Sequence, residues 1–152
     1  MKAKKIAWLI ALTTASVLWL GPSVVAGTHG SEDLVETITV KGVKVNTLTA
    51  GRVKFLLDAR ERFFFIDLRP AKHFQEKRLP TARSIPMEEF DKRFTEIPRI
   101  GRVILYCDCA EDKIIEKAIF LDRQGYQNIV VMLDGFQEWS KRKFPLETGP
   151  RP

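Results

Sequence analysis

Apolar residues along this chain follow two different spacings, which together predict β-strands that alternate with α-helices. Continuous apolar runs at residues 63–66 and 103–106, and the segment 128–133, which is apolar after Asn128, are typical of short strands that a parallel sheet buries on both faces. An alternating, β-branched segment at 36–45 predicts one or two further strands, and a short strand is expected at 82–86. Buried strands of this kind need helices to cover both faces of their sheet.

The helices are predicted from apolar residues that recur at three- and four-residue spacing between these strands. A threonine at position 47 or 49 can cap the first helix, and Gly125 fits the position just after the end of a later one. Helical segments are expected at 50–59, 70–77, 87–94, before Gly125, and from Asp134 to the residue before Phe144. Alternation of strands and helices predicts an α/β fold with a mainly parallel sheet.

Residues 1–26 have the pattern of a secretory signal peptide. Three lysines precede an apolar run at 6–20, Gly21-Pro22 interrupts the run, and small residues at 24–26 supply a cleavage site. The run is shorter than the ~20 residues that a membrane span needs. We therefore expect an exported protein, periplasmic or secreted, that meets a membrane only if this segment stays uncleaved.

The net charge of +6 does not indicate a nucleic-acid-binding protein. Three of the basic residues belong to the leader, and the others are interleaved with acidic residues without a long basic run. With 2 cysteines and 2 histidines, the chain is not expected to have a disulfide framework, a resident metal or another cofactor.

Both cysteines follow the apolar run at 103–106. Cys107 stands where a buried strand ends, and a helix is expected to begin shortly after it. Backbone N–H groups and the helix dipole at such a place lower the pKa of a thiol and favour the thiolate. A cross-link between Cys107 and Cys109 would close a very small loop, which makes a poor structural staple. The cysteine pair therefore indicates a chemically reactive site and not a structural cross-link.

Five segments resemble, in the same order, the motifs of rhodanese-like (thiosulfate sulfurtransferase) domains. They are the Asp-x-Arg at 66–69, the segment at 77–82, the strand into the cysteine at 103–107, the Gly-Tyr segment at 125–129, and the Gly-Phe-x-x-Trp and aromatic-Pro pattern at 133–146. The resemblance implies a rhodanese-like domain at 47–149, after a lead-in and first strands at 27–46.

This resemblance implies a five-stranded, mainly parallel sheet with helices on both faces. It also implies that Cys107 is the nucleophile of a sulfurtransferase, which takes a sulfane sulfur from a small donor as a persulfide and passes it to a thiol acceptor. Expected substrate contacts come from the loop after the nucleophile and from the preceding strand end: Asp108, Cys109, Ala110, Glu111, Asp112, Lys113 and Arg69.

The loop after Cys107 departs from the family pattern. The family usually has a glycine and then an arginine there, whereas Asp112 stands at the arginine position here. Three carboxylates near the thiol oppose thiolate formation and repel thiosulfate, which is a dianion, and Lys113 offsets part of this. Arg78 and Thr81 also replace the histidine and glycine of the family. We expect weak activity towards thiosulfate.

Other interpretations of these residues stay open. Cys109 is either a resolving thiol that attacks a persulfide or sulfenic acid on Cys107, or a small loop residue. Glu111 and Asp112 suit the dipole of the helix they begin, and Asp67 with Arg69 can tie neighbouring loops together. Two further functions are a non-catalytic binding module with the rhodanese fold, and a redox or soft-metal protein that uses both thiols.

Overall fold

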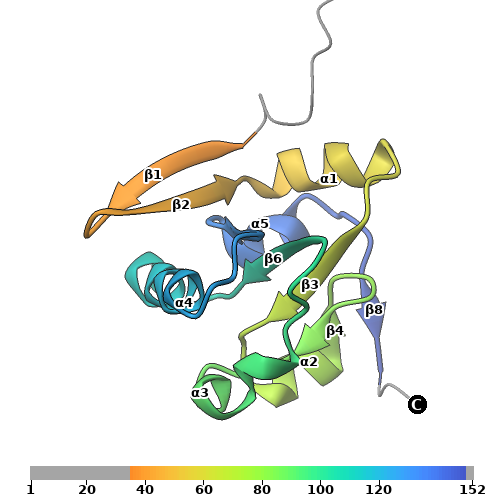
Figure 1. Cartoon of the computed structure of the whole chain (residues 1–152). Helices are drawn as coiled ribbons and strands as arrows, with labels where there is room; N and C mark the ends of the chain where they lie inside the picture. The colour runs from red at the N-terminus through yellow and green to blue at the C-terminus, as the bar shows by residue number, and fades with distance from the viewer. Residues whose placement is uncertain (1–34, 150–152) are drawn as a thin grey trace, which may run out of the picture.

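The computed structural model describes residues 35–149, which form a mixed α/β fold on a six-stranded sheet (Figure 1). The strands in spatial order are β1 (Glu36–Val40), β2 (Val43–Leu48), β7 (Ile129–Met132), β6 (Arg102–Tyr106), β3 (Phe63–Asp67) and β5 (Arg83–Ser84). All neighbours pair in parallel except β1 and β2. The mainly parallel sheet is confirmed, with β1 added to the five parallel strands.

The β1–β2 hairpin turns at Lys41 and Gly42, both of which have positive φ angles, 51° and 77°. Two such residues form the turn whose twist matches that of an antiparallel pair. The segment predicted to hold one or two strands therefore holds two. β2 also pairs with β7 on its other side, so that the hairpin forms one edge of the sheet (Figure 1).

Helices cover both faces of the sheet, as expected. On one face, α1 (Ala50–Asp58), α2 (Ala71–Glu76) and α5 (Gly135–Lys141) pack in an apolar cluster with Phe65 and Ile104. On the other, α3 (Phe90–Arg93) and α4 (Glu111–Arg123) pack with Ile66 and Leu105. Successive strand residues point to opposite faces. The continuous apolar runs of β3 and β6 are therefore the sequence signature of a sheet covered on both faces, although Phe64 of β3 is 42% exposed.

The structure differs from the sequence prediction at three short elements. The strand expected at 82–86 is only the two residues of β5, and a 3-10 turn, η2 (Phe94–Glu96), extends the helical segment after α3. The strands β4 (Lys77–Arg78) and β8 (Glu147–Thr148) form an antiparallel pair that the sequence did not predict. Pairs of two residues have no periodicity from which they could be recognised.

Contacts of the Arg78 side chain hold β4 against β8. Its guanidinium is 4% exposed, donates to the Gly149 carbonyl oxygen at 2.6 Å and lies 3.3 Å from a carboxylate oxygen of Glu147. The other carboxylate oxygen of Glu147 accepts the Thr81 N–H, at 2.9 Å, and Thr81 has a φ of 63°. The two departures from the family pattern, Arg78 and Thr81, therefore both bind the C-terminal strand.

No helix within residues 35–149 combines the length and the apolar character needed to cross a bilayer. The predicted signal peptide at 1–26 lies outside the described residues, as do residues 27–34 of the segment predicted as lead-in and first strands at 27–46.

Candidate active site

The two cysteines lie at the end of β6 and are joined in a disulfide, with their Cα atoms 5.3 Å apart. Cys107 is 8% exposed and belongs to the apolar cluster on the α4 face. Cys109 is exposed in the loop that leads to α4. The predicted nucleophile is therefore a nearly buried sulfur whose bonded neighbour faces solvent.

The first part of this loop is fixed against the start of α5. The Phe136 N–H donates to the Cys107 carbonyl oxygen at 3.3 Å, and the Gln137 N–H donates to the Asp108 carboxylate at 3.0 Å. Gly135, with a φ of 62°, permits this approach, because a Cβ atom there would overlap the Cys107 carbonyl oxygen. The position of Cys107 thus depends on a residue 28 positions later.

The second part of the loop leads into the N-terminus of α4. Ala110 occupies the N-cap and makes no side-chain hydrogen bond to the helix. The first backbone N–H groups of a helix have no partners within it and attract anions. Glu111 and Asp112 lie in this first turn and are exposed, and within residues 35–149 neither forms an ion pair with another side chain.

Asp67 and Arg69 form a buried ion pair at the end of β3. The guanidinium of Arg69, which is 3% exposed, lies 2.7 Å from the Asp67 carboxylate and donates to the Lys77 carbonyl oxygen at 2.7 Å. It also stacks on Phe136, 3.6 Å from the ring centroid. Burial alone would lower the pKa of Arg69, but the hydrogen bond and charge of Asp67 raise it overall. Arg69 is therefore a permanent positive charge beneath the loop.

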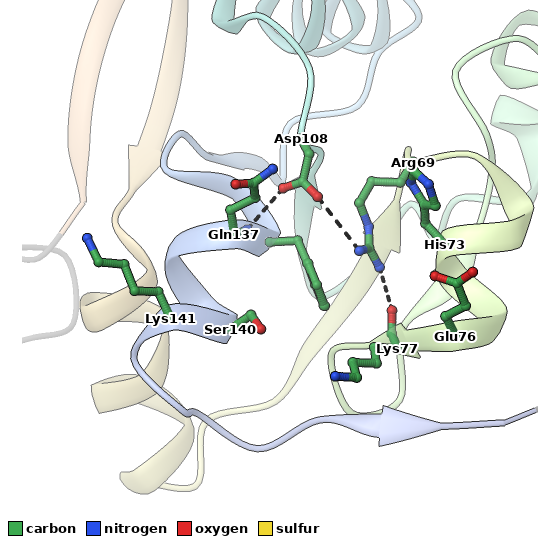
Figure 2. Close-up of a pocket in the computed structure, with 9 residues that line it drawn as sticks. Arg69, His73, Glu76, Lys77, Asp108, Gln137, Ser140 and Lys141 are labelled. Carbon is green, nitrogen blue, oxygen red and sulfur yellow. Dashed lines mark hydrogen bonds and ion pairs between the residues drawn. The ribbon is translucent and has the colours of Figure 1, made fainter.

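Figure 2 shows Arg69 and Asp108 pointing towards one another, with Gln137 on the far side of Asp108. The Arg69 Nη1 atom lies 3.8 Å from the Asp108 carboxylate, which is 21% exposed. Arg69 and the Gln137 N–H together offset the charge of Asp108. Of the three carboxylates expected to oppose an anion, Glu111 and Asp112 are the two that form no ion pair in the described part of the chain.

Tyr106 completes the buried network, which sequence reasoning had missed. Its hydroxyl donates to Asp67 at 2.6 Å and accepts the Leu79 N–H at 3.3 Å. Burial of the phenol, followed by the negative charge of Asp67, raises the pKa of Tyr106 well above its ordinary value of 10.0. The network thus joins the ends of β3 and β6 to the segment after β4.

Tyr106→Phe is expected to lower the free energy of unfolding at pH 7 by about 1–3 kcal/mol, because a buried carboxylate loses a donor. The raised pKa means that the folded protein holds the phenol proton more tightly than the unfolded chain does. The tyrosine therefore stabilises the fold fully below about pH 10 and progressively less above it.

Urea unfolding at pH 7 and above pH 10 measures both effects. The difference between wild type and Tyr106→Phe should shrink at the higher pH. Tyr126→Phe is the matched control, because the Tyr126 hydroxyl donates to a backbone carbonyl at 3.1 Å instead of a buried carboxylate. An equal loss in both variants at pH 7 would contradict the prediction.

A pocket of about 530 Å³ lies beside Arg69 and Asp108, between α2 and α5 (Figure 2). It is lined by Arg69, His73, Glu76, Lys77, Asp108, Phe136, Gln137, Ser140 and Lys141. Positive and negative groups are mixed in this lining, and neither cysteine belongs to it. The sequence singled out only Arg69 and Asp108 of these nine residues.

The predicted site residues are thus divided between two sides of the loop. Arg69 and Asp108 meet at the pocket, whereas Glu111 and Asp112 line a separate groove with Val40 and Lys41 of the hairpin. Cys109, Ala110 and Lys113 are exposed and line neither. The role of these residues in substrate binding stays a prediction.

Sequence reasoning did not identify the parts played by Tyr106, Gly135, Phe136 and Gln137. Only the pairing of an Asp-Gly dipeptide with a helix start hinted at a tight turn at 134–135. Within residues 35–149, no three His, Cys, Asp or Glu side chains gather as they would around a metal ion. The described site places two sulfur atoms just before the start of α4.

Comparison with known proteins identifies the family of this site. A family model described as the rhodanese-like domain matches residues 49–142. A curated sulfurtransferase from Allochromatium vinosum is 24% identical over 102 residues, which cover 67% of this chain and 94% of that protein. An HTH-type transcriptional regulator from Mycobacterium tuberculosis is 25% identical over 126 residues, which cover 83% of this chain. The match spans only 55% of the regulator's length.

Solved structures show the same fold. A rhodanese-related protein from Thermoplasma volcanium superposes with a TM-score of 0.58 at 19% identity, over 66% of this chain and 96% of that one. Thiosulfate sulfurtransferase from Pseudomonas aeruginosa superposes with a TM-score of 0.56 at 29% identity. That match covers 68% of this chain and 20% of the Pseudomonas chain.

Proposed function

Because the chain belongs to the rhodanese-like domain family, we propose that it is a sulfurtransferase in which Cys107 carries a sulfane sulfur as a persulfide. The observation that carries the proposal is the place of Cys107, at the end of a central parallel strand and just before the uncapped start of α4. A thiolate and a persulfide anion are both stabilised by backbone N–H groups at such a place.

The reaction begins from the reduced cysteine. The Cys107 thiolate attacks the outer sulfur of a donor such as thiosulfate, the sulfur–sulfur bond of the donor breaks, and sulfite leaves with the bonding electrons. Cys107 then carries the persulfide. A thiol acceptor takes the outer sulfur in the second step and returns Cys107 to the thiolate. No cofactor takes part in either step.

The charges around the loop bear on the choice of donor. Asp108 is offset by Arg69 and by the Gln137 N–H, but Glu111 and Asp112 keep two negative charges in the first turn of α4. Like charges repel a dianion more strongly than a neutral or singly charged donor. We therefore expect slow loading by thiosulfate.

Intact-mass measurement of the Cys109→Ser variant tests the proposed function, because that variant keeps only the proposed nucleophile. After incubation with thiosulfate, polysulfide or glutathione persulfide, it should gain one sulfur atom that maps to Cys107. The double variant Cys107→Ser/Cys109→Ser is the control and should gain none. Absence of an adduct with all three donors would refute the enzyme and favour a binding module with the rhodanese fold.

Asp112→Arg is expected to raise kcat/KM for thiosulfate by about tenfold, since replacing a negative by a positive charge near the sulfur is worth roughly 1–2 kcal/mol. Asp122→Arg makes the same charge change on the exposed far end of α4 and is the matched control. Steady-state formation of sulfite measures both variants. An equal gain in the two would show that only the overall charge matters.

Export is a further part of the proposal and rests on the leader pattern of residues 1–26. N-terminal sequencing of protein recovered from the periplasm or medium of an expressing bacterium should show cleavage after Ala26. An intact N-terminus on cytoplasmic protein would contradict it.

A further inference from the structure

The two sulfur atoms are held where they can react with each other, and the function proposed above uses only one of them. Asp108, the single residue between the cysteines, has its carboxylate held on the α5 side by the Gln137 N–H and by Arg69. The backbone bends at Asp108 and Cys109, which leaves the Cα atoms of the two cysteines 5.3 Å apart, less than the ~6.6 Å that two residues of extended strand span. The bend, held by the anchored Asp108, thus brings Cys107 and Cys109 together, where they form the disulfide.

We propose that Cys109 resolves the Cys107 persulfide, so that the protein releases the sulfur as hydrosulfide and closes the Cys107–Cys109 disulfide. This inference rests on the function proposed above. It adds a second reaction, the reduction of sulfane sulfur to sulfide, for which the two cysteines supply the electrons.

The step balances as a thiol–disulfide exchange. The Cys109 thiolate attacks the inner sulfur of the persulfide, Sγ of Cys107, and the bond to the outer sulfur breaks. The outer sulfur leaves as hydrosulfide with the persulfide proton and the bonding electron pair. Two electrons pass to it from the two cysteine sulfurs, which end as a disulfide. The product bond is the one the structure contains.

Burial favours this internal reaction over transfer to an outside thiol. Cys107 is only 8% exposed, so a bulky acceptor approaches its persulfide poorly. Cys109 is two residues away and already within bonding reach. A reactant held in place on the same molecule acts at an effective concentration far above that of a dissolved thiol.

A second turnover requires an external dithiol as reductant. One thiolate of the dithiol attacks the sulfur of Cys109, which is the exposed end of the disulfide, and forms a mixed disulfide with it. The second thiol of the reductant then displaces Cys109, and the reductant is released as an internal disulfide. Cys107 is the leaving thiolate of the first exchange, beside the start of α4, where a negative charge is stabilised. The difference in exposure between the two cysteines thus assigns them different roles.

A single-turnover experiment tests the proposal. Reduced protein, freed of reductant, is mixed with thiosulfate in the absence of any thiol, and sulfide is trapped with a bromobimane. A parallel sample of Cys107→Ser protein corrects for breakdown of the donor. Wild type should release about one sulfide per chain and lose two hydrogen atoms in mass relative to the reduced form. Cys109→Ser should keep one extra sulfur atom on Cys107 and release no sulfide.

The same proteins differ in sustained turnover. With cyanide as acceptor and no dithiol, wild type should stop after about one turnover because the disulfide closes, whereas Cys109→Ser should continue. Dithiothreitol should restore turnover to wild type. Cys109→Ala repeats the test without a hydroxyl at this position.

Each other outcome has a definite meaning. Wild type that keeps the extra sulfur and releases no sulfide would overturn the resolving role and leave the proposed sulfurtransferase intact. An extra sulfur that maps to Cys109, or a disulfide between two chains, would also overturn it. Absence of the adduct from both Cys109 variants with thiosulfate, polysulfide and glutathione persulfide alike would instead refute the sulfurtransferase itself.

Discussion

Gly135→Ala is expected to lower the free energy of unfolding by about 2–5 kcal/mol and to slow sulfur loading of Cys107. Alanine at this position would have to adopt the φ of 62° that the fold requires, and its Cβ atom makes that conformation cost about 1–2 kcal/mol. The same atom would overlap the Cys107 carbonyl oxygen, and overpacking of this kind costs a further ~1–3 kcal/mol. Because that oxygen belongs to backbone, relief of the overlap has to move the cysteine.

Gly42→Ala is the matched control. Gly42 also has a positive φ, 77°, but a Cβ atom there would meet nothing within 4 Å. It should therefore lose only the ~1–2 kcal/mol of backbone strain and load sulfur at the rate of wild type. Urea unfolding and intact-mass loading, both in a Cys109→Ser background, measure the two properties. Equal losses of stability would contradict a tight contact between Gly135 and Cys107.

Asp67→Asn is expected to cost about 3–5 kcal/mol, the usual price of leaving a buried charge without its partner. Arg69 is 3% exposed and Asp67 is fully buried, so water cannot replace the lost carboxylate. The same guanidinium reaches the Lys77 carbonyl and lies near Asp108. The substitution should therefore loosen the loop after Cys107 as well as the end of β3.

Asp58→Asn removes a carboxylate from an exposed pair with Lys54, 2.6 Å apart, and should cost no more than about 1 kcal/mol. The double variant Asp67→Asn/Arg69→Met should lose less than the sum of its two single variants, because it leaves no fully buried charge without its partner. Chemical unfolding of all five proteins measures these differences. An additive double variant would show that the two charges do not depend on each other.

The buried network shows how far sequence reasoning reached. The Asp-x-Arg spacing was enough to suggest that Asp67 and Arg69 tie loops together, and the structure places them in one ion pair. Tyr106 was recognised only as part of a strand, although its hydroxyl bonds Asp67 from 39 positions away. A single aromatic residue in an apolar run has no feature that shows which carboxylate its hydroxyl meets.

The surroundings of three side chains on α2 and α5 also could not be predicted from the sequence. His73 lies on a polar helix face in the sequence pattern, and Phe136 and Trp139 recur at core spacing. In the fold, Trp139 is completely buried, whereas Phe136 stacks on Arg69 and lines the pocket with His73. Their different surroundings depend on how α2 and α5 sit against the ends of the strands.

The sequence by itself determined the alternation of strands and helices, the order of the family motifs and the position of Cys107 before a helix. These follow from periodicity and neighbour chemistry, which act over a few residues. Only the tertiary structure decided that Asp108 faces Arg69, that Gly135 seats the cysteine backbone, and that Cys107 and Cys109 pair. Asp108 and Arg69 are 39 positions apart and Gly135 and Cys107 are 28 positions apart, and side-chain direction at such meetings is set by packing and long-range hydrogen bonds. The cysteines are only two positions apart, but the loop that brings them together is anchored through Asp108 by those same long-range contacts.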